Sequence, residues 1–261
     1  MSLNSESLFP TTVIGAGAWG TALAIAMARK GNEVVLWGRD AQHLADMQST
    51  RSNERYLPGL KLPETLIIEA DFDKAVTSAK HVLVSVPSIA FSEMLQNIKP
   101  LLAEGIPLSW ATKGLTPETG EFLLDTAKVM LGSPHALAVI SGPSFAAEVA
   151  KDLPTAVTVA AEDETFAQLL ASALHSSTLR AYTTHDVLGV QIGGTVKNVL
   201  AISAGISDGL GYGANARAAL ITRGMAEILR LAENLGAQTE TMFGLSGIGD
   251  LILTCTDDQS R

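Results

Sequence analysis

The sequence predicts an α/β protein, in which a doubly wound, largely parallel sheet is followed by an all-α second domain. Three observations predict this fold. A glycine-rich turn follows the first apolar segment, short apolar segments alternate with helical ones as far as residue 185, and strand signals then stop. We therefore expect two domains, residues 1–185 and residues 186–261.

The first β-α-β unit is the clearest part of the chain. TTVI, at 11–14, is a short β-branched strand. Residues 19–30 are rich in Ala and Leu and predict a helix that Gly31 ends. EVVLW, at 33–37, then predicts a second strand. This order is typical of parallel strands joined by a crossover helix.

The same alternation continues to the end of the first domain. Further strands are predicted at 81–86, 107–111, 136–141, 156–161 and 179–183. Helices are predicted at 91–98, 117–130 and between the last two strands. Strands with continuous apolar runs indicate a sheet that is covered on both faces.

The second domain is predicted from long segments rich in Ala, Leu and Gly. They indicate helices over 187–207 and 216–235 and from near Gly249, with a loop at 208–215 in which Asn215 caps the second helix. Such a domain exposes much apolar surface unless something covers it, so we expect further helices to complete it.

Composition and charge exclude several classes of protein. Of the 261 residues, 17% are charged and 47% are hydrophobic, which is typical of a globular chain. The net charge of −9, without a basic cluster, argues against nucleic-acid binding. The single cysteine, Cys255, excludes an intramolecular disulfide and a cysteine-based zinc site, and we expect no metal. It also fits a reducing compartment, so we expect a cytoplasmic protein.

One apolar segment, residues 187–207, is long enough to cross a membrane. Lys197 lies at its centre, where a charge costs about 2.5–3.5 kcal/mol. The N-terminus lacks the basic start and apolar run of a signal peptide. The sequence therefore predicts no membrane span.

GAGAWG, at 15–20, has the G-x-G-x-x-G pattern of dinucleotide-binding turns. It follows a strand and opens a helix, which is the context that this motif requires. Gly15 permits the tight turn, Gly17 lets the backbone approach a pyrophosphate, and Gly20 lets helix and strand pack closely. Ala18 and Trp19 belong to the same cofactor loop, and Trp19 either stacks on the cofactor or fills the core. The first domain is therefore predicted to be a Rossmann-type dinucleotide-binding domain.

The end of the second predicted strand bears on cofactor choice. A site selective for NAD places an acidic residue there to bind the ribose 2′-hydroxyl, whereas an arginine can bind the 2′-phosphate of NADP. The sequence reads Trp37, Gly38, Arg39, Asp40. NADP is thus favoured over NAD, with the alternative that Arg39 is an ordinary surface residue.

Lys197 is the only charge in its apolar segment, and Asp250 lies in an equally apolar one. A buried acid without a partner is costly, so we expect the two to pair. Reduction of a ketone needs a proton for the developing alkoxide, which Lys197 could supply with Asp250 orienting it. Burial should lower the pKa of Lys197 and Asp250 should oppose that shift. Thr254 lies one helical turn after Asp250, and a plain structural salt bridge is the alternative.

Other polar residues follow predicted strands, where ligands bind in α/β proteins. Lys113 is a candidate cofactor or substrate contact, with a surface lysine as the alternative. Ser144 is a candidate contact or the cap of a helix that begins at Phe145. The five histidines are scattered without metal-ligand spacing and are predicted to lie at the surface or in loops: His43, His81, His135, His175 and His185.

Several motifs resemble the NAD(P)-dependent glycerol-3-phosphate dehydrogenases of the bacterial type. They are GAGAWGTALA, WGRD, ATKGL, SGPSFAAEV, GGTVKNVLAISAGISDGLGYGANARAAL and GLSGIGDLILTC. The resemblance spans residues 13–261. It implies reversible reduction of dihydroxyacetone phosphate to sn-glycerol 3-phosphate, a small-molecule phosphate substrate, and a supply of glycerol phosphate for phospholipid synthesis. A homodimer is an open alternative.

The resemblance also implies roles for individual residues. Lys197 matches the catalytic acid/base, with Asp250 and Thr254 beside it in the catalytic and substrate site. Lys113 matches a residue that contacts both cofactor and substrate. The remaining matches are substrate contacts at Gly142 and Ser144, a cofactor contact at Ala146, and the start of a phosphate-binding S-R-N motif at Ser260 and Arg261. Members of the family continue for several tens of residues beyond this motif, so we expect the helical domain to be incomplete here.

Two other functions stay open at this point. A β-hydroxyacid dehydrogenase shares the fold and a G-x-x-x-K motif, which Gly193 to Lys197 fits. That family resembles G-x-x-x-K-x-x-x-N, however, and this chain has Ala201 at the last position. The second alternative is an NADP-binding module without catalysis, which would be expected to lose the buried lysine or its acid.

Overall fold

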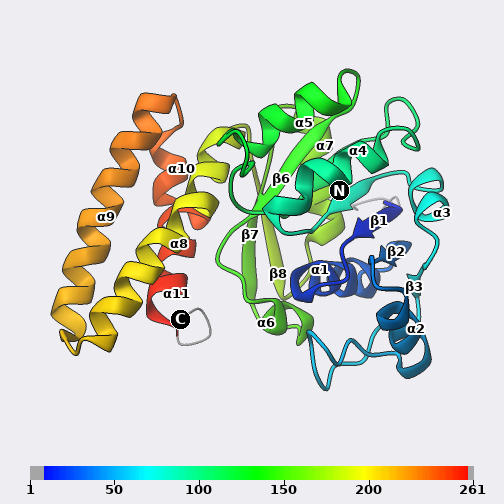
Figure 1. The fold of residues 1–261 in the computed structure, drawn as a ribbon, viewed down its shortest axis with the longest axis horizontal. Helices are drawn as coiled ribbons and strands as arrows, with labels where there is room; N and C mark the ends of the chain where they lie inside the picture. Colours follow the sequence, from blue (N-terminus) through cyan, green and yellow to red (C-terminus); the bar gives the residue numbers. More distant parts are fainter. Residues whose placement is uncertain (1–8, 258–261) are drawn as a thin grey trace, which may run out of the picture.

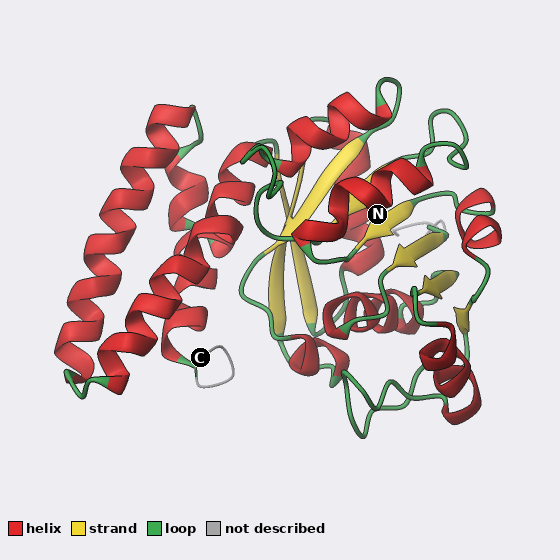
Figure 2. Ribbon diagram, viewed as in Figure 1, coloured by secondary structure: helices red, strands yellow, loops and turns green. Residues whose placement is uncertain are grey.

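The computed structural model describes residues 9–257, and within them eight strands form a single sheet (Figures 1 and 2). The strands are β1 (Thr11–Ile14), β2 (Val34–Trp37), β3 (Leu66–Ile68), β4 (Val82–Val84), β5 (Leu108–Trp110), β6 (Leu137–Ser141), β7 (Thr155–Ala161) and β8 (Leu179–Thr184). Their order is β3-β2-β1-β4-β5-β6-β7-β8. All neighbours are parallel except β6 and β7, which run antiparallel. The predicted, largely parallel sheet is confirmed.

Helices cover both faces of the sheet. The helices of this part are α1 (Ala18–Arg29), α2 (Ala41–Thr50), α3 (Phe72–Thr77), α4 (Phe91–Ile98), α5 (Leu123–Leu131), α6 (Ala146–Ala150) and α7 (Glu164–Leu174), with a 3-10 turn at Ser88–Ala90. Buried side chains of α1, α2, α6 and α7 form one core cluster with the sheet. Those of α3, α4 and α5 form a second. Neighbouring residues of β1 serve the two layers, because Val13 belongs to the first cluster and Ile14 to the second.

Only helices follow the last strand in the described chain. They are α8 (Val187–Gly209), α9 (Gly213–Leu235), α10 (Thr239–Phe243) and α11 (Asp250–Thr256), with a π-helical turn, η2, at Leu245–Gly249. Helices α8 and α9 run side by side, away from the sheet, in Figure 1. These helices share a third core cluster that includes Ile192, Met225 and Leu251. The division at residue 185 remains a prediction, although β8 ends at Thr184 and α8 begins at Val187.

Helix α8 is long and apolar enough to cross a membrane by length and composition, the one such helix among the described residues. Half of its most apolar window is buried inside the protein. It packs against α9, α11 and the π-helical turn. The apolar residues on the buried half of α8 therefore belong to the core of the helical part.

Two predicted element starts are wrong, and one segment was not predicted. The helix predicted from residue 117 begins at Leu123, because Leu115 and Phe122 pair in a β-bridge around a turn at Gly120, where φ is +72°. Helix α9 begins at Gly213, so Asn215 lies inside it and does not cap it. The segment α2-β3-α3 was not predicted, although Asp40 and Asp71 cap its two helices and were available as signals.

Two histidines correct the expectation that all five lie at the surface or in loops. His43 is 7% exposed and lies on α2. His81 is buried more deeply. Its side chain is completely buried in the core beside β1 and β5. Its two ring nitrogens lie 3.1 Å from the Thr11 hydroxyl and 2.8 Å from the Ser109 hydroxyl. The ring stacks on Phe9 at a centroid distance of 4.9 Å. Burial lowers the pKa of His81 to about 3, so the folded protein holds it neutral.

This burial predicts a loss of stability in mild acid. An unfolded chain binds a proton at His81 near pH 6.5, and the folded chain does not, so the stability present above pH 6.5 falls as the pH drops toward 3. Between pH 7 and pH 5 we expect His81 to account for about 2 kcal/mol of the decrease. Urea unfolding at both pH values should show a smaller decrease for His81→Gln than for the wild type. The exposed His185→Gln serves as the control, and an equal decrease in all three proteins would contradict the assignment.

Candidate functional site

Two lysines and one aspartate from distant parts of the chain meet where the sheet adjoins the helices. Lys113 follows β5, Lys197 lies in the middle of α8, and Asp250 opens α11. The Asp250 carboxylate accepts a hydrogen bond from each lysine: Oδ1 lies 2.6 Å from Lys197 Nζ and Oδ2 lies 2.6 Å from Lys113 Nζ. Asp250 is 1% exposed, whereas the side chains of Lys113 and Lys197 keep 21% and 12% of their surface exposed. One buried carboxylate thus holds two ammonium groups at the edge of solvent.

Thr254 and Gly142 each give one of the two ammonium groups a second hydrogen-bond acceptor. Lys197 Nζ donates to the Thr254 hydroxyl at 3.1 Å, and that hydroxyl donates to the Asp250 backbone carbonyl at 2.6 Å. Lys113 Nζ lies 3.4 Å from the Gly142 carbonyl, at the end of β6. Because Asp250 and Thr254 are four residues apart on α11, both side chains face α8. The predicted pairing of Lys197 with Asp250 is confirmed as a contact.

Close packing of α8 against the π-helical turn brings Asp250 to Lys197. A Cβ atom added at Gly193 would lie 2.1 Å from the Ser246 carbonyl oxygen, so only glycine fits there. Asp186 joins α8 to the segment that leads into α10. Its carboxylate caps α8 through the Gly189 amide at 2.8 Å and accepts the Gln238 amide, just before α10, at 2.9 Å. The helix that carries Lys197 is therefore held against the π-helical turn directly before Asp250 and against the segment before α10.

Burial and charge both act on Lys197. Desolvation, and then the positive charge of Lys113, lower the pKa of Lys197 to about 8, while Asp250 acts in the opposite direction. The direction of the shift agrees with the expectation from burial. A lysine with this pKa can both hold and release a proton near neutral pH, which an ordinary exposed lysine cannot do.

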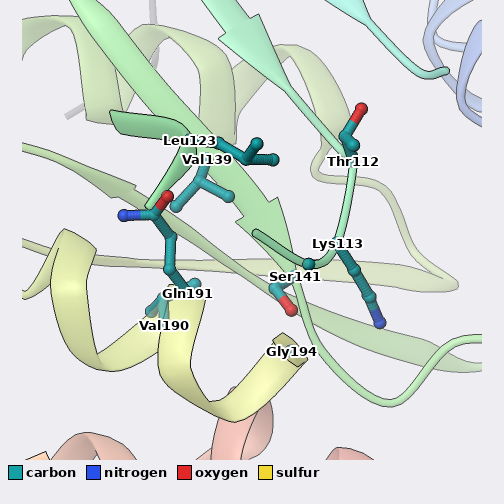
Figure 3. Close-up of a pocket in the computed structure, with 9 residues that line it drawn as sticks. Thr112, Lys113, Leu123, Val139, Ser141, Val190, Gln191 and Gly194 are labelled. Carbon is teal, nitrogen blue, oxygen red and sulfur yellow. The ribbon is translucent and has the colours of Figure 1, made fainter. Parts of the chain in front are cut away.

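A small cavity adjoins Lys113, between the end of β5 and α8 (Figure 3). Ser141, Gln191 and Gly194 are among the residues that line it. Gln191 Oε1 accepts the Leu124 amide at 3.0 Å, which ties α8 to the start of α5. The Ser141 hydroxyl and Gln191 Nε2 are buried without a protein partner in the described structure, as is typical of groups that bind ordered water.

The glycine-rich turn fits a dinucleotide. Gly15 has φ of +124° and approaches Ser85 so closely that a Cβ would lie 2.2 Å from its carbonyl oxygen. A Cβ at Gly20 would lie 2.0 Å from the Gly15 carbonyl oxygen, whereas one at Gly17 would meet no atom within 4 Å. No side chain caps α1, so the amide groups of its first turn are available to phosphate. The tight turn at Gly15 and the close packing at Gly20 agree with the sequence prediction, and the approach of a pyrophosphate to Gly17 stays a prediction.

The other predicted cofactor residues lie around this turn. Trp19, the second residue of α1, is partly buried and packs against the first core cluster. This contact favours the alternative in which Trp19 fills the core. Ala18 is the first residue of α1, and Ala146 is the first residue of α6. Arg39 is exposed directly after β2. Lys113 is half-buried rather than a free surface lysine, which removes that alternative.

The remaining residues predicted for the substrate side are Ser144, Ser260 and Arg261. Ser144 does not cap a helix: α6 begins at Ala146 after Phe145, and the Ser144 hydroxyl donates to the Gly142 carbonyl at 3.3 Å. The hydroxyl is therefore held toward Gly142, beside Lys113. Ser260 and Arg261 lie outside the described residues.

Sequence reasoning missed two features of the site. The contact between Lys113 and Asp250 was not predicted, because it depends on how the end of β5 faces α11. Asn53 was also missed. It is completely buried, and its Nδ2 donates to the Ala16 carbonyl at 3.1 Å and to the Thr21 hydroxyl at 2.8 Å. Nothing in its local sequence separates it from an ordinary loop asparagine.

Comparisons with known proteins agree with this geometry. Residues 10–167 match the model of the N-terminal domain of NAD-dependent glycerol-3-phosphate dehydrogenase, and residues 186–261 match that of its C-terminal domain. The chain is 55% identical over 251 residues to a glycerol-3-phosphate dehydrogenase [NAD(P)+] of Idiomarina loihiensis, which covers 96% of this chain and 75% of the relative. It is 51% identical over 262 residues to that of Photobacterium profundum, covering 100% and 78%.

Solved structures lead to the same family. The crystal structure of glycerol-3-phosphate dehydrogenase from Coxiella burnetii is 46% identical, with a TM-score of 0.93, and the match covers 97% of this chain and 78% of that one. The glycerol-3-phosphate dehydrogenase of yeast is 26% identical with a TM-score of 0.86, and the match covers 97% of this chain and 79% of that one. The chain therefore belongs to the NAD-dependent glycerol-3-phosphate dehydrogenase family.

Proposed function

We propose that this protein interconverts dihydroxyacetone phosphate and sn-glycerol 3-phosphate with NAD(P)H. The observation that carries the proposal is the pair of lysines on one buried carboxylate, with Asp250 2.6 Å from both ammonium groups. A ketone needs positive charge and a proton at its oxygen when it is reduced, and this pair offers both at the edge of solvent. Relatives that are 51–55% identical carry the name of this activity.

Lys197 is proposed as the acid/base. A bound nicotinamide cofactor supplies or accepts the hydride. Lys197 gives its proton to the carbonyl oxygen in reduction and takes a proton from the alcohol in oxidation, which suits a pKa of about 8. Asp250 orients the Lys197 ammonium and Thr254 holds it from a second side. Lys113 is proposed to stabilise the same developing negative charge and to contact the cofactor.

The remaining predicted residues are proposed to hold substrate and cofactor. The turn of Gly15, Gly17 and Gly20 with the start of α1 would bind the pyrophosphate. Gly142, whose carbonyl lies beside the Lys113 ammonium, and Ser144, whose hydroxyl donates to that carbonyl, are proposed substrate contacts. Ser260 and Arg261 are proposed to bind the substrate phosphate, and Ala146 to contact the cofactor.

The test is oxidation of NADPH or NADH, followed by absorbance, with dihydroxyacetone phosphate as substrate. We expect turnover with this substrate and none with a β-keto acid of similar size, which needs no phosphate site. A version extended to the length of the relatives should be assayed in parallel, because the match covers 75% of the relative from Idiomarina loihiensis. Turnover of the β-keto acid alone would favour the hydroxyacid alternative. Binding of NADPH without any turnover would favour the module without catalysis.

The cellular setting is part of the same proposal. A dehydrogenase of this family would act in the cytoplasm and supply glycerol phosphate for phospholipid synthesis. A homodimer is proposed, since apolar side chains such as Val199, Ile202 and Ile206 are more than half exposed on α8.

A further inference from the structure

Three segments converge on the dinucleotide turn at Ala16. The turn itself is the first, and the end of β2 is the second: a Cβ added at Gly38 would lie only 2.8 Å from the Ala16 Cβ. The loop after α2 is the third, because Asn53 donates to the Ala16 carbonyl at 3.1 Å. Residues close to Gly38 and Asn53 in sequence are therefore held beside the turn that would bind the cofactor.

Arg55 and Asp40 join the second and third of these segments. Arg55 Nη1 lies 2.7 Å from Asp40 Oδ2, and the two side chains are 49% and 46% exposed. The other carboxylate oxygen, Oδ1, accepts the His43 amide at 3.0 Å and caps α2. These two bonds hold the pKa of Asp40 below its usual range, so Asp40 stays negatively charged.

Both carboxylate oxygens of Asp40 therefore accept hydrogen bonds from groups within the protein. An acidic residue selects NAD by accepting the ribose 2′-hydroxyl. Each oxygen of Asp40 already accepts another donor, so a ribose hydroxyl would have to share an oxygen with Arg55 or with the His43 amide. Asp40 serves as a helix cap and as the anchor of Arg55.

The same ion pair changes the charge that an incoming phosphate would meet. Without Arg55, the negative charge of Asp40 would offset that of its neighbour Arg39. With Arg55, the cluster of Arg39, Asp40 and Arg55 carries a net charge of +1. A guanidinium is also a fork of five N–H donors, so the bond of Nη1 to Asp40 leaves other N–H groups able to contact a second anion.

We propose that Arg39 and Arg55 together bind the 2′-phosphate of NADP, and that Arg55 determines the preference for NADP over NAD. Arg55 acts in two ways: it contacts the 2′-phosphate and it neutralises Asp40. This inference rests on the proposed use of nicotinamide dinucleotides. It adds a specificity-determining residue from a loop outside the β-α-β unit that carries the glycine motif.

The test is calorimetric titration with adenosine 2′,5′-bisphosphate and with 5′-AMP, which differ only in the 2′-phosphate and need no turnover. We expect Arg55→Ala to weaken binding of the bisphosphate by about 10- to 100-fold and to leave binding of 5′-AMP within about twofold. Arg55→Lys should give an intermediate loss, because it keeps the charge without the fork. Arg230→Ala, which breaks another exposed ion pair, with Glu227 on α9, should change neither affinity.

Asp40→Asn separates binding by Arg55 from a merely structural ion pair. Asparagine keeps the helix cap and removes the charge, so the proposal predicts unchanged or tighter binding of the bisphosphate. Loss of bisphosphate affinity in Asp40→Asn equal to that in Arg55→Ala would overturn it, as would no loss in Arg55→Ala or an equal loss for 5′-AMP. Failure of the proposed function is a different result: wild-type protein that discriminates the two nucleotides but does not reduce dihydroxyacetone phosphate.

Discussion

Replacing Lys197 with methionine is expected to lower kcat for reduction of dihydroxyacetone phosphate by about 10²–10⁴. Methionine has a similar length and fills the same space, but it has neither a charge nor a proton to give. Lys113 stays in place to hold part of the developing charge, which is why a residual rate is expected. Steady-state NADPH oxidation at saturating substrate, with the version of the protein that turns over, gives kcat directly.

Lys128→Met is the matched control for this substitution. Lys128 forms an exposed ion pair with Glu162 and lies outside the site, so the variant should retain wild-type turnover. The affinity for NADPH should be similar in both variants, because Lys197 is proposed to act on the substrate oxygen. A Lys197→Met protein with kcat within about threefold of wild type would contradict the assigned role.

The pH profile gives a second measurement of the same role. Reduction requires the Lys197 ammonium, so its rate should fall as the pH rises through about 8, and oxidation requires the neutral amine, so its rate should rise over the same range. An ordinary lysine would place this change near pH 10.5. Lys197→Met should lose the transition near pH 8 in its residual activity.

Local signals in the sequence were enough to predict the first β-α-β unit. The unit Thr11–Trp37 was predicted because its glycine turn, its helix stop at Gly31 and its apolar strands are properties of neighbouring residues. The segment α2-β3-α3 was missed because β3 has only three residues and its pairing with β2 depends on tertiary contact. The antiparallel direction of β7 is likewise set by how the chain returns through α6, and no residue of the strand encodes it.

The candidate site, too, could be predicted from the sequence only in part. Lys197 and Asp250 could be paired from sequence because each is a lone charge in an apolar segment. A buried charge is costly unless a group of opposite charge lies beside it. The contact of Lys113 with the same carboxylate could not be predicted, because it is set by the packing of the sheet against α11. Helix α8 packs closely on the π-helical turn because Gly193 has no Cβ, and this close approach is visible only in the structure.

Asp250→Asn is expected to have the second large effect, on stability as well as on activity. It leaves the ammonium groups of Lys113 and Lys197 close together without their counter-charge. We expect the free energy of unfolding to fall by up to about 3 kcal/mol, the lower end of the range for an unpaired buried charge, because one lysine can release its proton instead. Denaturant unfolding at pH 7 measures this loss. Asp208→Asn, which breaks the more exposed pair with Arg217, should cost less than about 1 kcal/mol.

The same substitution distinguishes an orienting role of Asp250 from a purely structural one. Asp250 raises the pKa of Lys197 while burial and Lys113 lower it, so its removal should move the alkaline limb of the reduction rate to lower pH. A structural acid would reduce the amount of folded enzyme and leave the pH profile of the remaining activity where it was. Measuring kcat per folded molecule across pH 6–9 therefore decides the matter. An unshifted limb with normal kcat would show that Asp250 only holds α11 against α8, and that the chemistry belongs to the two lysines alone.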